Sequence, residues 1–163
     1  MLPLFDVCSL MFQALYAKGY RSLTIQIGNG TFVPPTGEME GIQVEYFRFK
    51  NSLAEDIQRA DLMISHAGAG SCLEALEAGK PLVVVINEDL MDNHQMELAW
   101  QLYQDGYSLY TTCADLNEKI QSMDLKSLKP FPLAETHTFA HFIDSMFGFP
   151  SHWSRAGLST ALC

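Results

Sequence analysis

The 163-residue chain is poor in basic residues, with 10 lysines and arginines against 19 aspartates and glutamates, and its formal net charge is -9. Nucleic-acid binding depends on basic side chains that neutralise phosphates, so this composition argues against a nucleic-acid partner. The argument does not extend to a small anionic ligand, because backbone N–H groups at the start of a helix can hold a phosphate without any basic side chain.

The chain also lacks a cysteine pattern and a long apolar run. The four cysteines, which form no C-x-x-C pair and no metal-site spacing, are Cys8, Cys72, Cys113 and Cys163. The first twelve residues lack a basic stretch, and Asp6 interrupts their apolar run, so they do not have the pattern of a signal peptide. The longest apolar stretch, Pro81–Ile86, is too short to span a bilayer. We therefore expect reduced thiols in a cytoplasmic protein.

Short apolar segments alternate with amphipathic ones along the chain. Apolar runs predict strands at residues 23–27, 42–49, 61–65, 81–86 and 107–111. Apolar residues at helical spacing predict helices at residues 5–18, 52–59, 72–78, 93–104, 116–123 and 139–147. The core face expected for the helix over 93–104 is Met96, Ala99, Trp100 and Tyr103. Residues 28–41 are rich in glycine and proline, which predicts a loop.

Two of these helices carry signals at their ends. Ser52 and Glu55 have the spacing of a capping box at the start of the helix over 52–59. Gly79 follows the helix over 72–78, where a left-handed residue commonly ends a helix. These signals support the predicted order of elements.

The alternation of strands and helices predicts an α/β fold. Right-handed crossovers between successive strands give a Rossmann-like, mostly parallel sheet with helices on both faces. The hydrophobic content of 48% is sufficient for a core. Ligands of such sheets bind at the carboxyl ends of the strands. This rule selects the loops that follow Ser65 and Ile86.

The first of these loops has features of an anion site. Gly68 and Gly70 lack Cβ atoms and would let a ligand approach the backbone closely. Ser71 and the first N–H groups of the following helix would then face that ligand. The helix dipole favours a diphosphate there by about 0.3–1 kcal/mol per charge.

Two other nucleotide-binding motifs fit the sequence less well. In the dinucleotide fingerprint G-x-G-x-x-G, Gly68 and Gly70 would be followed by a third glycine, but Leu73 stands there. No acidic residue ends the next predicted strand either, which disfavours a nicotinamide-dependent oxidoreductase. Lys80 lies beyond the helix and not at Walker spacing, which disfavours a P-loop NTPase.

The two loops contain side chains that allow two interpretations each. Ser71 and Glu74 have the spacing of a capping box, or Glu74 accepts hydrogen bonds from ribose hydroxyls. Asp92 to Gln95 could likewise cap the next helix. Alternatively, His94 and Gln95 lie near the strand ends and bind a sugar or phosphate. The residues alone leave both interpretations open.

Several motifs in order carry a family resemblance: residues 60–71, Glu74, 79–81, 83–87 and 93–95. With these motifs the chain resembles the cytosolic donor-binding subunits of eukaryotic UDP-N-acetylglucosamine transferases, which act in the second step of dolichol-linked oligosaccharide assembly. These are family 28 glycosyltransferases, similar to the C-terminal domain of the bacterial lipid II glycosyltransferase of GT-B type. The resemblance spans residues 5–123 and weakens after Lys129.

The resemblance implies an activity shared between two chains. This chain would bind UDP-N-acetylglucosamine for transfer to N-acetylglucosaminyl-diphosphodolichol in protein N-glycosylation. A membrane-anchored partner would bind that acceptor and hold this chain at the cytosolic face of the endoplasmic reticulum. Transfer would be inverting, without metal or cofactor. We nominate no catalytic residue, because the base in this fold usually comes from the acceptor half.

The resemblance also implies a set of UDP-sugar-binding residues. Glycines and Ser71 would meet the diphosphate, Glu74 the ribose, and the second loop the sugar or phosphates. The full set is His66, Gly68, Gly70, Ser71, Glu74, Asn87, His94 and Gln95. We expect residues 1–148 to form the donor-binding domain and residues 149–163 a poorly ordered tail.

One departure from the family pattern lies at the N-terminus. Family members begin with an apolar strand and a Gly-Thr-rich loop before the helix that matches residues 5–18. Here the sequence starts almost at that helix, so we expect the first strand and its loop to be missing and neighbouring strand edges to be exposed. The alternative function is a non-catalytic family product that binds the membrane partner or acts as a regulator.

Overall fold

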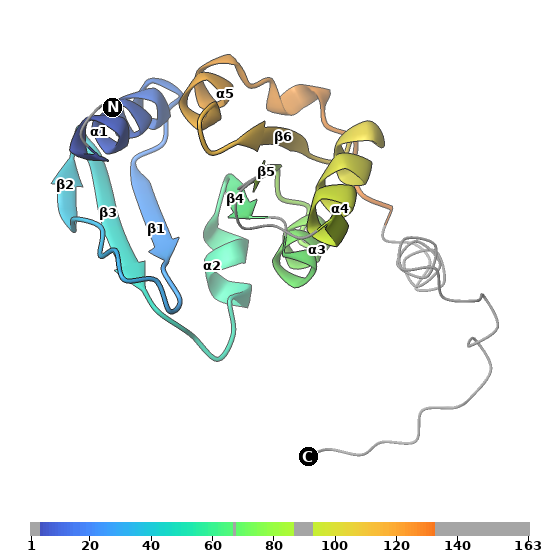
Figure 1. Ribbon diagram of the computed structural model, residues 1–163, viewed down its shortest axis with the longest axis horizontal. Coiled ribbons are helices and arrows are strands. Elements are labelled where there is room, and N and C mark those ends of the chain that lie inside the picture. Colours follow the sequence, from blue (N-terminus) through green and yellow to red (C-terminus); the bar gives the residue numbers. More distant parts are fainter. Residues whose placement is uncertain (1–3, 67, 87–92, 133–163) are drawn as a thin grey trace.

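The computed structural model describes residues 4–66, 68–86 and 93–132 (Figure 1). The helices are α1 (Leu4–Ala17), α2 (Ala54–Arg59), α3 (Ala69–Glu77), α4 (Asn93–Gln104), α5 (Leu116–Ser122) and the short 3-10 helix η1 (Leu125–Ser127). The strands are β1 (Ser22–Gln26), β2 (Gly37–Met39), β3 (Ile42–Phe47), β4 (Met63–His66), β5 (Leu82–Ile86) and β6 (Leu109–Thr112). No helix in these ranges has the length and apolar character needed to cross a membrane. The helix expected at residues 139–147 and the tail at 149–163 lie outside the described residues.

The strands form two three-stranded sheets. One has the order β4-β5-β6 and is parallel throughout. The other has the order β1-β3-β2, in which β1 runs parallel and β2 antiparallel to β3. β1 and β4 therefore each lie at an edge of a sheet within the described part of the chain. The predicted parallel pairing is confirmed, apart from β2.

β2 corrects the prediction that residues 28–41 are all loop. Glu40 and Gly41 have φ angles of 52° and 79°, which allow a two-residue reversal between β2 and β3. This turn pairs Met39 with Ile42. The ring of Tyr16 covers Gly41 so closely that a Cβ atom there would lie 2.5 Å from Tyr16 Cε2. A side chain at position 41 would displace the Tyr16 ring and would be strained at this φ. The glycines of residues 28–41 thus belong in part to a hairpin.

β5 is the centre of the core. All five of its residues are buried. Because side chains alternate along a strand, Val84 and Ile86 face one cluster while Val83 and Val85 face another. The first cluster includes Cys72 and other residues of α3 and α4. The second cluster joins β5 to the other sheet and to α1 and α5. The residues that contact it are Phe12, Leu15, Ile42, Val44 and Ile120.

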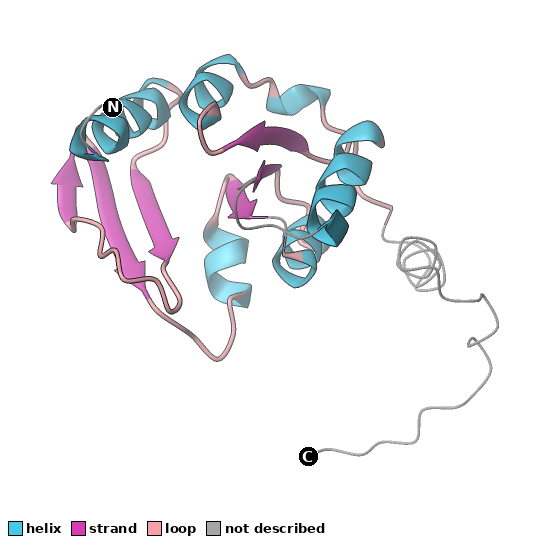
Figure 2. Ribbon diagram, viewed as in Figure 1, coloured by secondary structure: helices cyan, strands magenta, loops and turns pink. Residues whose placement is uncertain are grey.

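Helices consequently cover both faces of the β4-β5-β6 sheet. α3 and α4 pack against β5 on one side, while α1 and α5 pack against each other over the other cluster (Figure 2). Gly79 ends α3 with a φ of 67°, as predicted for a left-handed residue after a helix. The expected α/β arrangement with helices on both faces is confirmed.

The core face predicted for α4 is wrong at three of its four positions. The buried residues of this helix are Leu98, Ala99 and Leu102. Trp100 is 52% exposed, and its ring lies 5.7 Å from Tyr103 and 6.0 Å from Tyr110, centroid to centroid. Met96 and Tyr103 are exposed as well. This helix has two neighbouring apolar stripes. The aliphatic stripe, Leu98, Ala99 and Leu102, is buried toward β5, while the rings of Trp100 and Tyr103 stay at the surface.

Leu102→Ala is expected to lower the free energy of unfolding by about 2–5 kcal/mol, because it removes a fully buried side chain and leaves a cavity. Trp100→Ala is expected to cost clearly less, although it removes more atoms. Urea denaturation followed by circular dichroism measures both changes. Equal losses for the two variants would contradict this placement of the α4 core face.

Candidate functional site

α3 is oriented by its buried face. Cys72, Ala75 and Leu76 are buried in the cluster around β5. Residues three and four positions apart share a face of a helix, so Ser71 and Glu74 lie together on the other side. Packing on β5 thus fixes where these two polar side chains stand.

The start of α3 differs from the prediction. The helix begins at Ala69 and not near residue 72, and its N-cap is Gly68 in an extended conformation with φ -74° and ψ 118°. The Cys72 N–H donates to the Gly68 carbonyl at 3.1 Å, which is the first hydrogen bond within the helix. Gly70 and Ser71 therefore lie in the first turn, where backbone N–H groups have no acceptor within the helix.

This geometry rules out the capping-box interpretation of Ser71 and Glu74. Ser71 is inside the helix, and the N-cap residue Gly68 has no side chain that could accept a hydrogen bond. Glu74 is thus not held at the helix end, and its exposed carboxylate faces solvent.

A cavity of about 670 Å³ lies beside this face of α3. One part of its wall comes from α3, through Gly70, Ser71, Glu74, Glu77 and Ala78. The rest comes from Gln26, from residues 50–54 and from two residues of α2, Ile57 and Gln58. The volume is within the range of small-molecule sites. The contributing segments follow the carboxyl ends of β1, β3 and β4, as expected for a parallel α/β sheet.

The structure brings together three of the eight nominated residues, Gly70, Ser71 and Glu74. His66 ends β4 and Gly68 precedes α3, and neither lines this cavity. His94 and Gln95 belong to the first turn of α4, and their side chains lie outside the described part of the structure, as does Asn87. For these three residues, the proposed contacts stay predictions.

Sequence reasoning missed the part of the wall at residues 50–54 and Gln26. Glycine and polar side chains draw attention to the loops after Ser65 and Ile86, at the carboxyl ends of two predicted strands. Residues 50–54 follow the predicted strand at 42–49 in the same way. Their lack of a glycine motif made them less conspicuous than residues 66–71.

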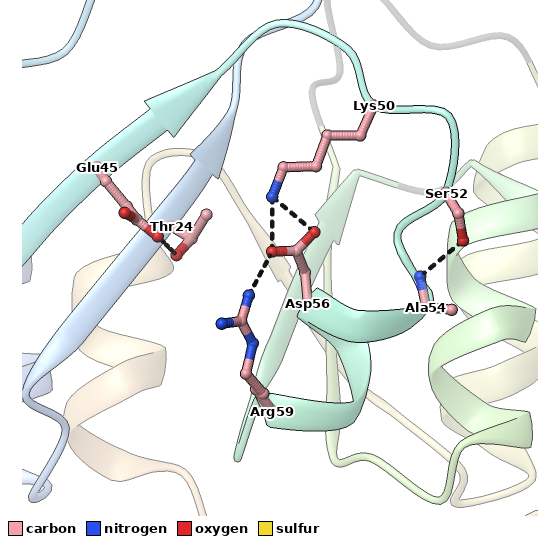
Figure 3. Close-up of polar contacts among 7 residues, drawn as sticks. All are labelled: Thr24, Glu45, Lys50, Ser52, Ala54, Asp56 and Arg59. Atoms are coloured by element: carbon pink, nitrogen blue, oxygen red, sulfur yellow. Dashed lines mark hydrogen bonds and ion pairs between the residues drawn. The ribbon is translucent and has the colours of Figure 1, made fainter.

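The start of α2 also differs from its predicted capping box. The N-cap is Leu53, and the Ser52 hydroxyl accepts from the Ala54 N–H at 3.2 Å (Figure 3). The Ile57 N–H donates to the Leu53 carbonyl at 2.9 Å. A capping box would require Ser52 to be the N-cap, but the helix begins one residue later. Ser52 therefore stabilises the turn before α2, and this turn forms part of the cavity wall.

A compact ion-pair cluster lies behind that turn. Lys50 Nζ donates to both Asp56 carboxylate oxygens, at 2.7 and 2.8 Å, and Arg59 reaches the same carboxylate at 3.3 Å (Figure 3). Lys50 Nζ also lies 4.2 Å from the centroid of the Phe47 ring. The hydrogen bond from Lys50 is the main reason that the pKa of Asp56 lies below its usual value. The carboxylate is therefore charged at neutral pH.

Cys72 does not belong to the reactive part of the site. Its thiol is fully buried in the core cluster. Burial raises the pKa of the Cys72 thiol, and a hydrogen bond with Ser65 offsets part of that rise. A buried thiol with a raised pKa is a poor nucleophile, so Cys72 serves the core.

The fold and the position of the cavity define a Rossmann-like α/β domain with a ligand site at the carboxyl edge of its strands. The model of the glycosyltransferase family 28 C-terminal domain matches residues 9–146. The chain belongs to this family, and the resemblance inferred from its motifs is confirmed.

Three curated relatives with similar sequences share one name. The UDP-N-acetylglucosamine transferase subunit ALG13 of Homo sapiens is 55% identical over 115 residues, which are 71% of this chain and 10% of that protein. The Mus musculus subunit is 56% identical over 105 residues, 64% of this chain and 9% of that protein. The Saccharomyces cerevisiae subunit is 34% identical over 114 residues, 69% of this chain and 55% of that protein. The chain thus spans about a tenth of the two mammalian relatives.

Solved structures agree with the fold. An NMR solution structure of ALG13 has a TM-score of 0.62 and 25% identity, covering 90% of this chain and 92% of that one. The crystal structure of MurG from Acinetobacter baumannii has a TM-score of 0.56 and 18% identity, covering 88% of this chain and 46% of that one. The predicted fold class, the C-terminal half of a GT-B glycosyltransferase, is confirmed.

Ser71→Ala is expected to change the free energy of unfolding by less than about 0.5 kcal/mol, because Ser71 is not the cap of α3. Removal of a serine that caps a helix typically costs about 0.5–2 kcal/mol. Thermal and urea denaturation of this variant beside the parent chain measures the difference. A loss of more than about 1 kcal/mol would restore the capping interpretation.

Proposed function

We propose that this chain is the donor-binding subunit of a glycosyltransferase that moves N-acetylglucosamine from UDP-N-acetylglucosamine to N-acetylglucosaminyl-diphosphodolichol. The observation that carries the proposal is the shared wall of Gly70, Ser71 and Glu74 in one cavity. Family membership and the names of the relatives supply the substrate class.

The start of α3 suits the diphosphate of the donor. The N–H groups of Gly70 and Ser71 have no acceptor within the helix, and the helix dipole favours negative charge at this end. A Cβ atom placed on Gly70 would meet nothing within 4 Å beyond its chain neighbours and the backbone of α3, so this face of the helix start is open to a ligand. The same electrostatics would stabilise UDP as it departs in an inverting transfer.

Glu74 suits the ribose. It lies one turn along α3 from Ser71 on the cavity face, and it takes no part in capping the helix. A carboxylate has two oxygens and can accept hydrogen bonds from two neighbouring hydroxyls. With the phosphates at the helix start, the nucleoside would extend along α3 past this side chain.

Isothermal titration with UDP-N-acetylglucosamine is expected to show binding, and Glu74→Ala is expected to weaken it by about tenfold or more, since hydrogen bonds to a charged group are lost. Glu118→Ala, on α5 and away from the cavity, is the matched control and should bind as the parent chain does. Folded parent chain that binds no ligand at millimolar concentration would refute the donor site. The non-catalytic alternative would then stand.

We further propose a membrane-anchored partner that binds the dolichol-linked acceptor, so that this chain acts at the cytosolic face of the endoplasmic reticulum. The relatives are named as subunits, which supports a second component. A lipid-linked acceptor also requires a membrane, whereas the described helices do not cross one.

Co-expression of the tagged chain with the candidate membrane subunit is expected to place this chain in the membrane fraction and to co-purify both proteins in detergent. The chain expressed alone is the control and should stay out of the membrane fraction. Equal distribution of this chain with and without the partner would contradict the complex.

A further inference from the structure

Lys50 is the only basic residue among the described residues that line the cavity. The same lining contains two carboxylates, Glu74 and Glu77, and the whole chain has a net charge of -9. A dianionic ligand that enters such a cavity meets repulsion unless a fixed positive charge offsets it. The helix start of α3 supplies partial charges only. Among the described residues that line the cavity, Lys50 is therefore the side chain that can offset the ligand's negative charge with a full positive charge.

Three contacts hold the Lys50 ammonium group in place. Two of its N–H donors point to the two Asp56 oxygens, at 2.7 and 2.8 Å. The Phe47 ring lies 4.2 Å away, at the distance of a cation–π contact. An ammonium group has three donors, and the Lys50 side chain is 39% exposed. One donor is thus left for a ligand, on a group whose position is already fixed.

The carboxylate of Asp56 does not cancel the charge of Lys50. Arg59 Nη2 lies 3.3 Å from Asp56 Oδ1, so two cations share one anion and the cluster has a net charge of +1 (Figure 3). The Asp56 side chain is only 19% exposed, and its oxygens point at these two partners. The result is a positive cluster beside a cavity that is otherwise acidic.

We propose that Lys50 is the anion-recognising side chain of this cavity and that it distinguishes a nucleoside diphosphate from the neutral nucleoside. The inference rests on the proposed nucleotide site and adds to it a determinant for charge, from the segment between β3 and α2. Asp56 and Phe47 hold the ammonium group, while its remaining N–H donor and its charge serve the phosphate. The ligand keeps the α3 helix start as its second anion contact.

The test compares UDP with uridine by NMR titration of the folded chain. Lys50→Met is expected to weaken UDP binding by about tenfold, the effect of one lost charge-assisted hydrogen bond, and to leave uridine binding unchanged. The loss should shrink when salt is raised from about 0.05 M to 0.5 M, because salt screens the interaction. Lys50→Gln, which keeps a polar group beside Asp56, should lose UDP affinity to the same degree. Lys50→Arg should keep most of it.

Lys126→Met is the matched control, since it removes the same charge from η1, away from the cavity. It should bind UDP as the parent chain does. Unchanged UDP affinity in both neutral Lys50 variants, or an equal loss of UDP and uridine, overturns the inference and leaves the proposed function intact. A parent chain that binds neither UDP nor uridine overturns both.

Discussion

The burial of β5 between two apolar clusters is the constraint on which the rest of the structure depends. Val84 and Ile86 contact the residues of α3 and α4, while Val83 and Val85 contact those of α1, α5 and the second sheet. A strand buried on both sides requires helices on both sides. The positions of α3 and of the sheet that carries β1 and β3 follow from these contacts, and the cavity lies between α3 and the carboxyl ends of β1 and β3.

This constraint explains how a short helix can present polar groups accurately. α3 has nine residues, and three of them, Cys72, Ala75 and Leu76, are locked into the β5 cluster. The opposite face has no freedom to rotate, so Ser71 and Glu74 stand in fixed positions on the cavity wall. Across the cavity, the turn before α2 is held by a hydroxyl and an ion-pair cluster instead of a core. One wall of the cavity, α3, is therefore positioned by apolar packing, and the opposite wall, the turn before α2, is positioned by polar and ionic contacts.

Sequence patterns predicted the order of elements apart from β2 and the parallel strands, because these depend on local periodicity and turn residues. They also selected Gly70, Ser71 and Glu74, which line the cavity. They could not place the start of α3, which depends on the backbone of Gly68 and not on a capping side chain. They also misplaced the α4 face, because Trp100 and Leu102 are both apolar and only packing on β5 separates them. Lys50 escaped notice because its role depends on Asp56 and Phe47, which meet it only in the folded chain.

The contact between α1 and α5 has a consequence for folding kinetics. These helices lie near opposite ends of the described chain and side by side in Figure 1. Lys18 Nζ donates to the Met123 carbonyl across 105 positions. Closing a loop of that length costs more chain entropy than closing the short loops between neighbouring strands. The two sheets should therefore assemble from nearby segments first. The docking of α1 on α5, which joins segments far apart in the sequence, is expected to follow and to slow folding.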